Sequence, residues 1–263
     1  MGFQPDVIIV QGDGADGGWA YTSTMGTDVK LLGTNSALSS DYISSIDVGG
    51  FTVKTAGNVD GDTYYFLAFD DADGAIDVGS IVGSASTQDI DVGYEPQNVW
   101  VFGDRGNYAD YSIFMFGNDD ANPYQFTTTD PQPGFAKIVE PNMNADGFTL
   151  AANGDGTATG TTYHYVTFDA SADVANGSYV GNETARSIDV SGGAAWAPDF
   201  MFTKASNNYE MLFKTSLMPS GTAWQFDGTA RSGSVLDLTT TGFDLGTDVR
   251  SNANSQTNYY SAY

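Results

Sequence analysis

The sequence predicts an all-β protein made of three tandem antiparallel β-sandwich-like repeats. The first observation is a block that occurs three times: a Gly-Phe opening, a short apolar alternation, a loop rich in Gly, Asn and Asp, and an aromatic strand. The copies span residues 50–69, 147–168 and 242–263, at nearly equal intervals. A fixed period is the signature of a repeat architecture, and two β-rich runs joined by a turn-rich loop predict a hairpin.

Composition is the second observation. All but four of the 33 acidic residues are aspartate, and the chain has 32 glycines. Asp and Gly favour turns, whereas Glu favours helices. A hydrophobic content of 41%, with 13% aromatics, is typical of a chain that builds a core. Helix is therefore expected to be nearly absent.

The period returns at a second point, where a proline precedes a β-rich strand. Residues 2–10 contain Pro5, residues 93–102 contain Pro96, and residues 197–204 contain Pro198. A turn followed by β-branched and aromatic residues predicts a strand. In the second repeat, residues 118–143 carry four prolines, and we expect a loop there.

A connector segment also recurs, at residues 70–93 and 169–192. Gly79-Ser80-Ile81-Val82-Gly83 matches Gly177-Ser178-Tyr179-Val180-Gly181 at one constant offset. Each connector leads into the proline-containing strand of the next repeat, which gives repeats of residues 1–75, 76–173 and 174–263.

The first repeat has no connector before it, so it is short of an edge strand. Unpaired strand edges are normally covered or used. A neighbouring subunit could fill the gap, residues 76–92 could fill it, or it could stay empty. Packing of the three repeats into one ring with pseudo-threefold symmetry is the alternative to a linear tandem.

Charge excludes several partners. The formal net charge is −24 with only nine Lys and Arg, and phosphate backbones need basic patches, so neither nucleic acid nor an anionic membrane is expected as a partner. The acidity favours a halophilic source, where salt screens self-repulsion. Use of Asp as a turn residue explains it equally well. The N-terminus has no basic, apolar signal pattern, and no run is long enough to span a membrane.

Candidate catalytic residues are few. His164 is the only histidine, and it aligns with Tyr65 and Tyr259, which favours an aromatic-sized strand position over a general base. No cysteine is present, and no nucleophile elbow precedes His164. Paired carboxylates of a glycosidase are set by the fold rather than by spacing. We therefore expect that the protein is not an enzyme and that it binds no cofactor.

Calcium is the one candidate ion. Asp13 and Asp16 stand three residues apart and Asp60 and Asp62 two residues apart, around glycines in two loops, and residues 153–156 have a similar pattern. Oxygen ligands around glycines suit Ca²⁺, but none of these loops completes an EF-hand. A solvated turn is the competing interpretation.

Among the tryptophans, Trp100 lies in a strand alternation and is expected to be buried. Trp19 borders a glycine-rich loop. It is therefore the candidate for an exposed ligand contact with a glycan or protein.

The whole chain resembles a repeat found in structural proteins of tailed phages and archaeal viruses. Residues 2–7, Pro198-Asp199, residues 147–150 and 162–168, residues 177–182 and residues 242–254 carry the resemblance. Two positions depart from it, since Gln97 rather than Asp follows Pro96 and Tyr263 rather than Phe ends the last strand.

The resemblance implies a virion component, such as a tail-fibre, turret or capsid-decoration subunit. Such a protein is expected in the extracellular particle as a homo-oligomer, in contact with other virion proteins and with a host-surface glycan or protein. A lectin-like glycan-binding module and a glycosidase are the alternatives.

Overall fold

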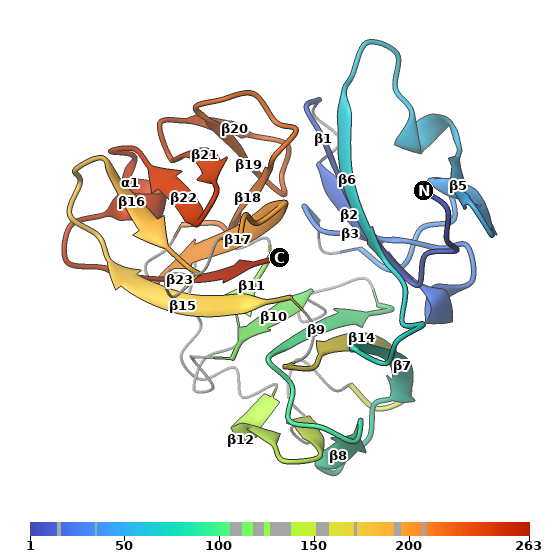
Figure 1. Cartoon of the computed structure of the whole chain (residues 1–263). Helices are drawn as coiled ribbons and strands as arrows, with labels where there is room; N and C mark the ends of the chain where they lie inside the picture. Colours follow the sequence, from blue (N-terminus) through green and yellow to red (C-terminus); the bar gives the residue numbers. More distant parts are fainter. Residues whose placement is uncertain are drawn as a thin grey trace.

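A computed structural model gives the structure and describes residues 1–14, 17–34, 36–105, 112–117, 124–126, 138–150, 158–170, 173–191, 196–206 and 209–263. Almost every element is a β-strand paired antiparallel to its neighbours, which confirms the predicted fold class. The described part contains one short α-helix, α1 (Val249–Asn252), and two 3-10 turns, η1 (Ser23–Met25) and η2 (Thr55–Gly57). Figure 1 shows three groups of strands arranged around the C-terminus.

The first repeat contains a four-stranded sheet and a separate hairpin. The sheet has the order β3-β2-β1-β6, and the hairpin is β4-β5. The strands are β1 (Val7–Gly12), β2 (Gly18–Thr22), β3 (Lys30–Leu31), β4 (Ile43–Asp47), β5 (Gly50–Val53) and β6 (Tyr64–Phe69).

The second repeat contains a five-stranded and a three-stranded sheet. Their orders are β11-β10-β9-β14-β7 and β12-β13-β8. The strands are β7 (Ile76–Val82), β8 (Gln88–Asp91), β9 (Asn98–Gly103), β10 (Ile113–Phe116), β11 (Tyr124–Gln125), β12 (Ile138–Asn144), β13 (Gly147–Leu150) and β14 (Thr162–Phe168).

The third repeat follows the same plan. Its sheets have the orders β15-β23-β17-β18-β19-β20 and β16-β22-β21. The strands are β15 (Ala175–Val180), β16 (Arg186–Asp189), β17 (Phe200–Ala205), β18 (Leu212–Thr215), β19 (Thr222–Gln225), β20 (Ala230–Ser232), β21 (Val235–Thr239), β22 (Gly242–Leu245) and β23 (Thr257–Ala262).

The connectors supply two strands each, both to the repeat that follows. β7 pairs with β14 and β8 with β13, while β15 pairs with β23 and β16 with β22. Residues 76–92 therefore belong to the second repeat and do not fill the edge of the first, which removes one of the three alternatives.

Each aromatic strand has two different faces, because successive side chains of a strand point to opposite sides. One face packs inside its own sandwich: Phe51 contacts Phe66, Phe148 contacts Tyr165, and Phe243 contacts Tyr260. Their ring centroids lie 5.5, 5.3 and 5.3 Å apart, at steep angles each time. The Gly-Phe phenylalanines thus occupy equivalent places in the three repeats.

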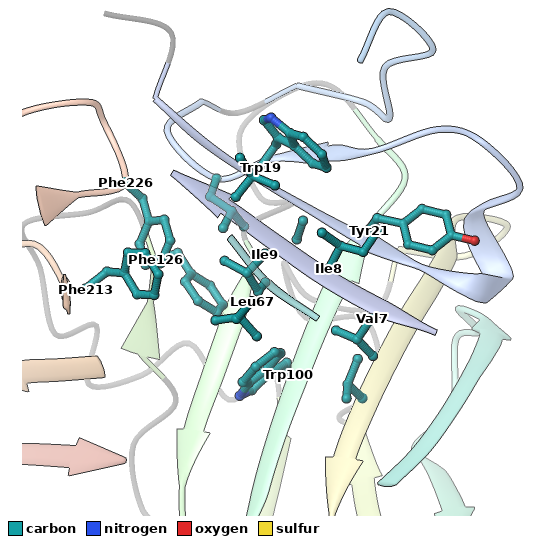
Figure 2. Packing of buried hydrophobic residues seen from close by; sticks show 14 of the residues in the cluster. Val7, Ile8, Ile9, Trp19, Tyr21, Leu67, Trp100, Phe126, Phe213 and Phe226 are labelled. Carbon is teal, nitrogen blue, oxygen red and sulfur yellow. The ribbon is translucent and has the colours of Figure 1, made fainter. Parts of the chain in front are cut away.

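The other face of the three large sheets builds one shared core. Phe69 and Phe168, which end β6 and β14, meet Tyr263, which directly follows β23. Their ring centroids lie 5.5, 5.1 and 6.0 Å apart. Trp100 packs against Phe168 and is fully buried, as predicted. Figure 2 shows side chains of all three repeats in this core. The repeats are therefore grouped around a centre rather than strung in a line.

Hydrogen bonds join each pair of repeats. Lys30 Nζ donates to the Gly103 carbonyl (2.7 Å), and Gly18 N donates to the Phe226 carbonyl (2.8 Å). The Asn98 amide and the Tyr263 hydroxyl form a bond of 2.8 Å. Buried polar groups are costly unless they are paired, so these contacts also fix how the repeats dock.

The prediction of a loop at residues 118–143 is partly wrong. Residues 118–123 and 127–137 lie outside the described part, but β12 runs through Pro141. The strand is at the edge of its sheet, and its register with β13 shifts between Ile138 and Met143. Edges and bulges are where a strand tolerates proline.

Candidate interaction site

The calcium candidates do not form a described ligand cluster. Asp13 Oδ1 accepts a hydrogen bond from Thr63 N (2.7 Å), which ties the end of β1 to the start of β6. The Asp62 carboxylate packs against Gly14, so Asp13 and Asp62 lie on neighbouring turns. Asp16 and residues 153–156 lie outside the described part. Among the described residues, no three or more His, Asp or Glu side chains are placed to hold a metal ion together. Asp60 therefore belongs to no such group.

Trp19 is buried, so its expected role as an exposed ligand contact is wrong. It lies in β2, between β1 and β3, with 1% of its surface exposed. Its ring packs against Tyr42 (5.9 Å between centroids) and Phe51 (6.3 Å). The hairpin β4-β5 covers this face of the sheet. The residues that flank Trp19 in the sequence do not indicate that a distant hairpin packs on it.

His164 is 4% exposed and lies between the first two repeats. Its Nδ1 is 2.7 Å from Thr24 Oγ1 of η1. Burial lowers the pKa of His164, and the Asp104 carboxylate opposes that shift. The hydrogen bond at Nδ1 thus joins two repeats, and a neutral ring has one nitrogen that donates and one that accepts.

A pocket opens beside the shared core, with a cavity volume of about 500 Å³. Its lining includes the aromatic residues Phe69, Phe168 and Tyr263 and four aspartates. The carboxylates are Asp70, Asp73, Asp173 and Asp199. A pocket lined by aromatic residues and carboxylates suits a sugar ring or an organic cation.

Three carboxylates approach one another where the first two repeats join. Burial raises the pKa of Asp71, and the nearby Asp6 carboxylate raises it further. Burial also raises the pKa of Asp77, while a hydrogen bond from Tyr165 opposes the shift. Asp71 N is also 3.3 Å from Asp6 Oδ2. Asp71 and Asp77 therefore take up protons more readily than free aspartates, mainly because burial disfavours the charged carboxylate.

The most distinctive feature is an uncovered sheet edge in the first repeat. β14 lies between β9 and β7, and β23 lies between β17 and β15, but β6 ends its sheet. The same holds in the smaller layer, where β13 and β22 lie between two strands and β5 pairs only with β4 among the described strands. No described strand occupies, in the first repeat, either of the two positions that a connector takes in the other repeats.

Side-chain exposure follows this difference. Phe66 is 48% exposed, whereas Tyr260 at the equivalent place is 7% exposed. Phe148 and Phe243 are fully buried, and Phe51 is only half-buried. Sequence reasoning chose Trp19 as the exposed aromatic and missed Phe66. The lack of a connector before the first repeat is the sequence feature that indicates an exposed Phe66, because Phe66 aligns with the tyrosines that the connectors cover.

Comparison with known proteins adds no relative: no model of a known protein family and no curated protein sequence matches the chain. No helix in the described ranges has the length and apolar content needed to cross a membrane.

Proposed function

We propose that the chain is a structural subunit of a virus particle, of the tail-fibre, turret or capsid-decoration type, with a display or host-attachment role. One observation carries the proposal. Three copies of one sandwich-like unit pack around a shared aromatic core. In the first copy, the described strands leave the edges of β6 and β5 unpaired. A packed body that offers an open strand edge suits assembly by strand addition, a recurring mode of protein association.

Charge is compatible with this role. A net charge of −24 keeps separate copies apart in solution through mutual repulsion. Contact with other particle proteins must then supply enough short-range binding to overcome that repulsion. The resemblance in the Gly-Phe blocks and the proline-containing strands supports the same class of protein.

Purified particles test the proposal. Quantitative mass spectrometry is expected to find the chain at a fixed copy number per particle, and electron microscopy to find it in a closed symmetric arrangement. Absence from washed particles, or a copy number that changes from one preparation to the next, would contradict a structural role.

A glycan-binding module is the second candidate, and the central pocket favours it. A pocket lined by aromatic residues and carboxylates is a common form of sugar site. A glycan array with the isolated chain tests this candidate, with Asp73→Asn and Asp173→Asn as pocket variants. Binding that both substitutions abolish would favour it, and no binding to any glycan would remove it. We expect no polysaccharide turnover; a rate that depends on one aspartate would overturn that expectation.

A further inference from the structure

The second and third repeats show what belongs on the uncovered edges. Each connector has the pattern Gly-Ser-[Ile/Tyr]-Val-Gly, then six residues, then Ile-Asp-Val. The glycine pairs with the aromatic strand, as Gly79 with Tyr165 and Gly177 with Tyr260. The isoleucine pairs with the Gly-Phe strand, as Ile90 with Phe148.

The glycine of the connector accommodates the aromatic ring. A Cβ placed on Gly79 would lie 2.1 Å from the Tyr165 hydroxyl oxygen, and one on Gly177 would lie 2.2 Å from that of Tyr260. An aromatic side chain over a cross-strand glycine is a recognised way to stabilise such a pair. Phe66 presents the same kind of ring in the first repeat with no glycine beneath it among the described residues.

Backbone groups of β6 are directed outward for such a partner. Asp13 N donates to the Thr63 carbonyl (2.9 Å), which makes these two a hydrogen-bonded pair of the β1-β6 ladder. Hydrogen-bonded pairs alternate along an antiparallel ladder. Tyr64, Phe66 and Ala68 therefore turn their N–H and C=O groups away from β1, as Tyr165 turns its own toward Gly79.

The second strand position is open as well. At Gly147 and Gly242, the carbonyls of Ile90 and Ile188 lie 1.9 and 2.0 Å from where a Cβ would be. At Gly50 the nearest atom is the Met1 methyl group, at 3.4 Å. The strand that fills this space in the other repeats has no counterpart in the described part of the first.

We propose that the edges of β6 and β5 bind an extended segment of another polypeptide that has the connector chemistry: a first strand whose glycine sits under Phe66, and a second strand whose isoleucine packs on Phe51. Backbone hydrogen bonds supply the binding energy and the glycine supplies the selectivity. The inference goes beyond the particle role and holds whether or not that role is correct.

A second copy of the chain is a poorer occupant. Both of its connectors already pair within their own repeats, so lending one would leave an equal edge open in the lender. An extended segment from a different polypeptide gains the new pairing without that loss.

The test uses the full chain and a labelled peptide of residues 76–92, the connector of the second repeat. We expect saturable binding by fluorescence anisotropy, and new amide-exchange protection limited to β6 and β5. The peptide carries three aspartates and no basic residue, so its affinity for this acidic protein should rise with added salt.

Matched variants make the test specific. A Gly79→Val peptide, and the protein variant Phe66→Ala, should each weaken binding about tenfold or more, a difference that an anisotropy titration resolves. Phe66→Tyr should retain binding, because tyrosine occupies this position in the other repeats. Ala68→Pro removes an outward N–H and should block binding while the chain stays folded.

Three results would overturn the inference. They are no binding by the wild-type chain, equal binding by the Ala68→Pro variant, and protection of β6 that grows with protein concentration without peptide. The third would assign the edge to a second copy. Each result leaves the particle inventory unaffected, so failure here is distinguishable from failure of the proposed function.

Discussion

The first repeat and the other two repeats share one set of aromatic positions but differ in what covers them. Phe148 and Phe243 are fully buried beneath a connector strand, while Phe51 is half-buried. Phe51 still contacts Phe66 at nearly the same centroid distance as its counterparts. The aromatic pair therefore forms without the connector. The connector determines the solvent-exposed fraction of the two rings.

The largest expected effect comes from truncating a covered phenylalanine. Phe148→Ala should lower the free energy of unfolding by about 3–5 kcal/mol, because it empties a filled site. Phe51→Ala should cost roughly 1–2 kcal/mol, because part of that ring is already in water. Urea denaturation measures both, with Phe243→Ala as a second covered case. Equal costs for Phe51→Ala and Phe148→Ala would contradict the comparison.

A smaller effect is expected from the connector glycine. Gly79→Val forces a side chain into the Tyr165 ring and should cost about 1–3 kcal/mol. Ser80→Val on the same strand is the control, because Ser80 is exposed. The double variant Gly79→Val with Tyr165→Ala should be less destabilised than the sum of the two changes, since the clash is gone. Simple additivity would show that the ring and the glycine do not interact.

The smallest effect is a pH dependence at the junction of the first two repeats. Burial holds the pKa of His164 below its usual 6.5. The unfolded chain therefore binds a proton first as the pH falls through 6.5, and the folded state loses stability until its own lower pKa is reached. His164→Tyr, with the residue type of Tyr65 and Tyr259, should remove this part of the loss. Thermal unfolding of both proteins across the mildly acidic range measures it, and parallel curves would contradict the assignment.

Sequence reasoning succeeded where the signal is periodic. Repeated Gly-Phe openings and aromatic strands predict the all-β repeat plan, and the connector glycines Gly79 and Gly177 recur at one constant offset. Such patterns are local, because strand alternation and turn residues act within a few positions.

Failures occurred where distant segments decide the outcome. Trp19 is buried by a hairpin that begins more than twenty residues later, and no property of its neighbours encodes that. Pro141 sits in β12 because the strand is an edge with a shifted register, which depends on its partner strands. Phe66 is exposed because no described strand lies beside that edge of β6, so comparison between repeats, rather than its own flanks, identifies it.

Residue-resolved amide exchange of the isolated chain tests the central claim most directly. The amide of Phe66 should exchange orders of magnitude faster than those of Tyr165 and Tyr260, because only the latter two lie beside a connector strand. The amide of Leu67, which faces β1, should stay protected and serves as the internal control. Equal protection of Phe66, Tyr165 and Tyr260 would show that the first repeat has no open edge.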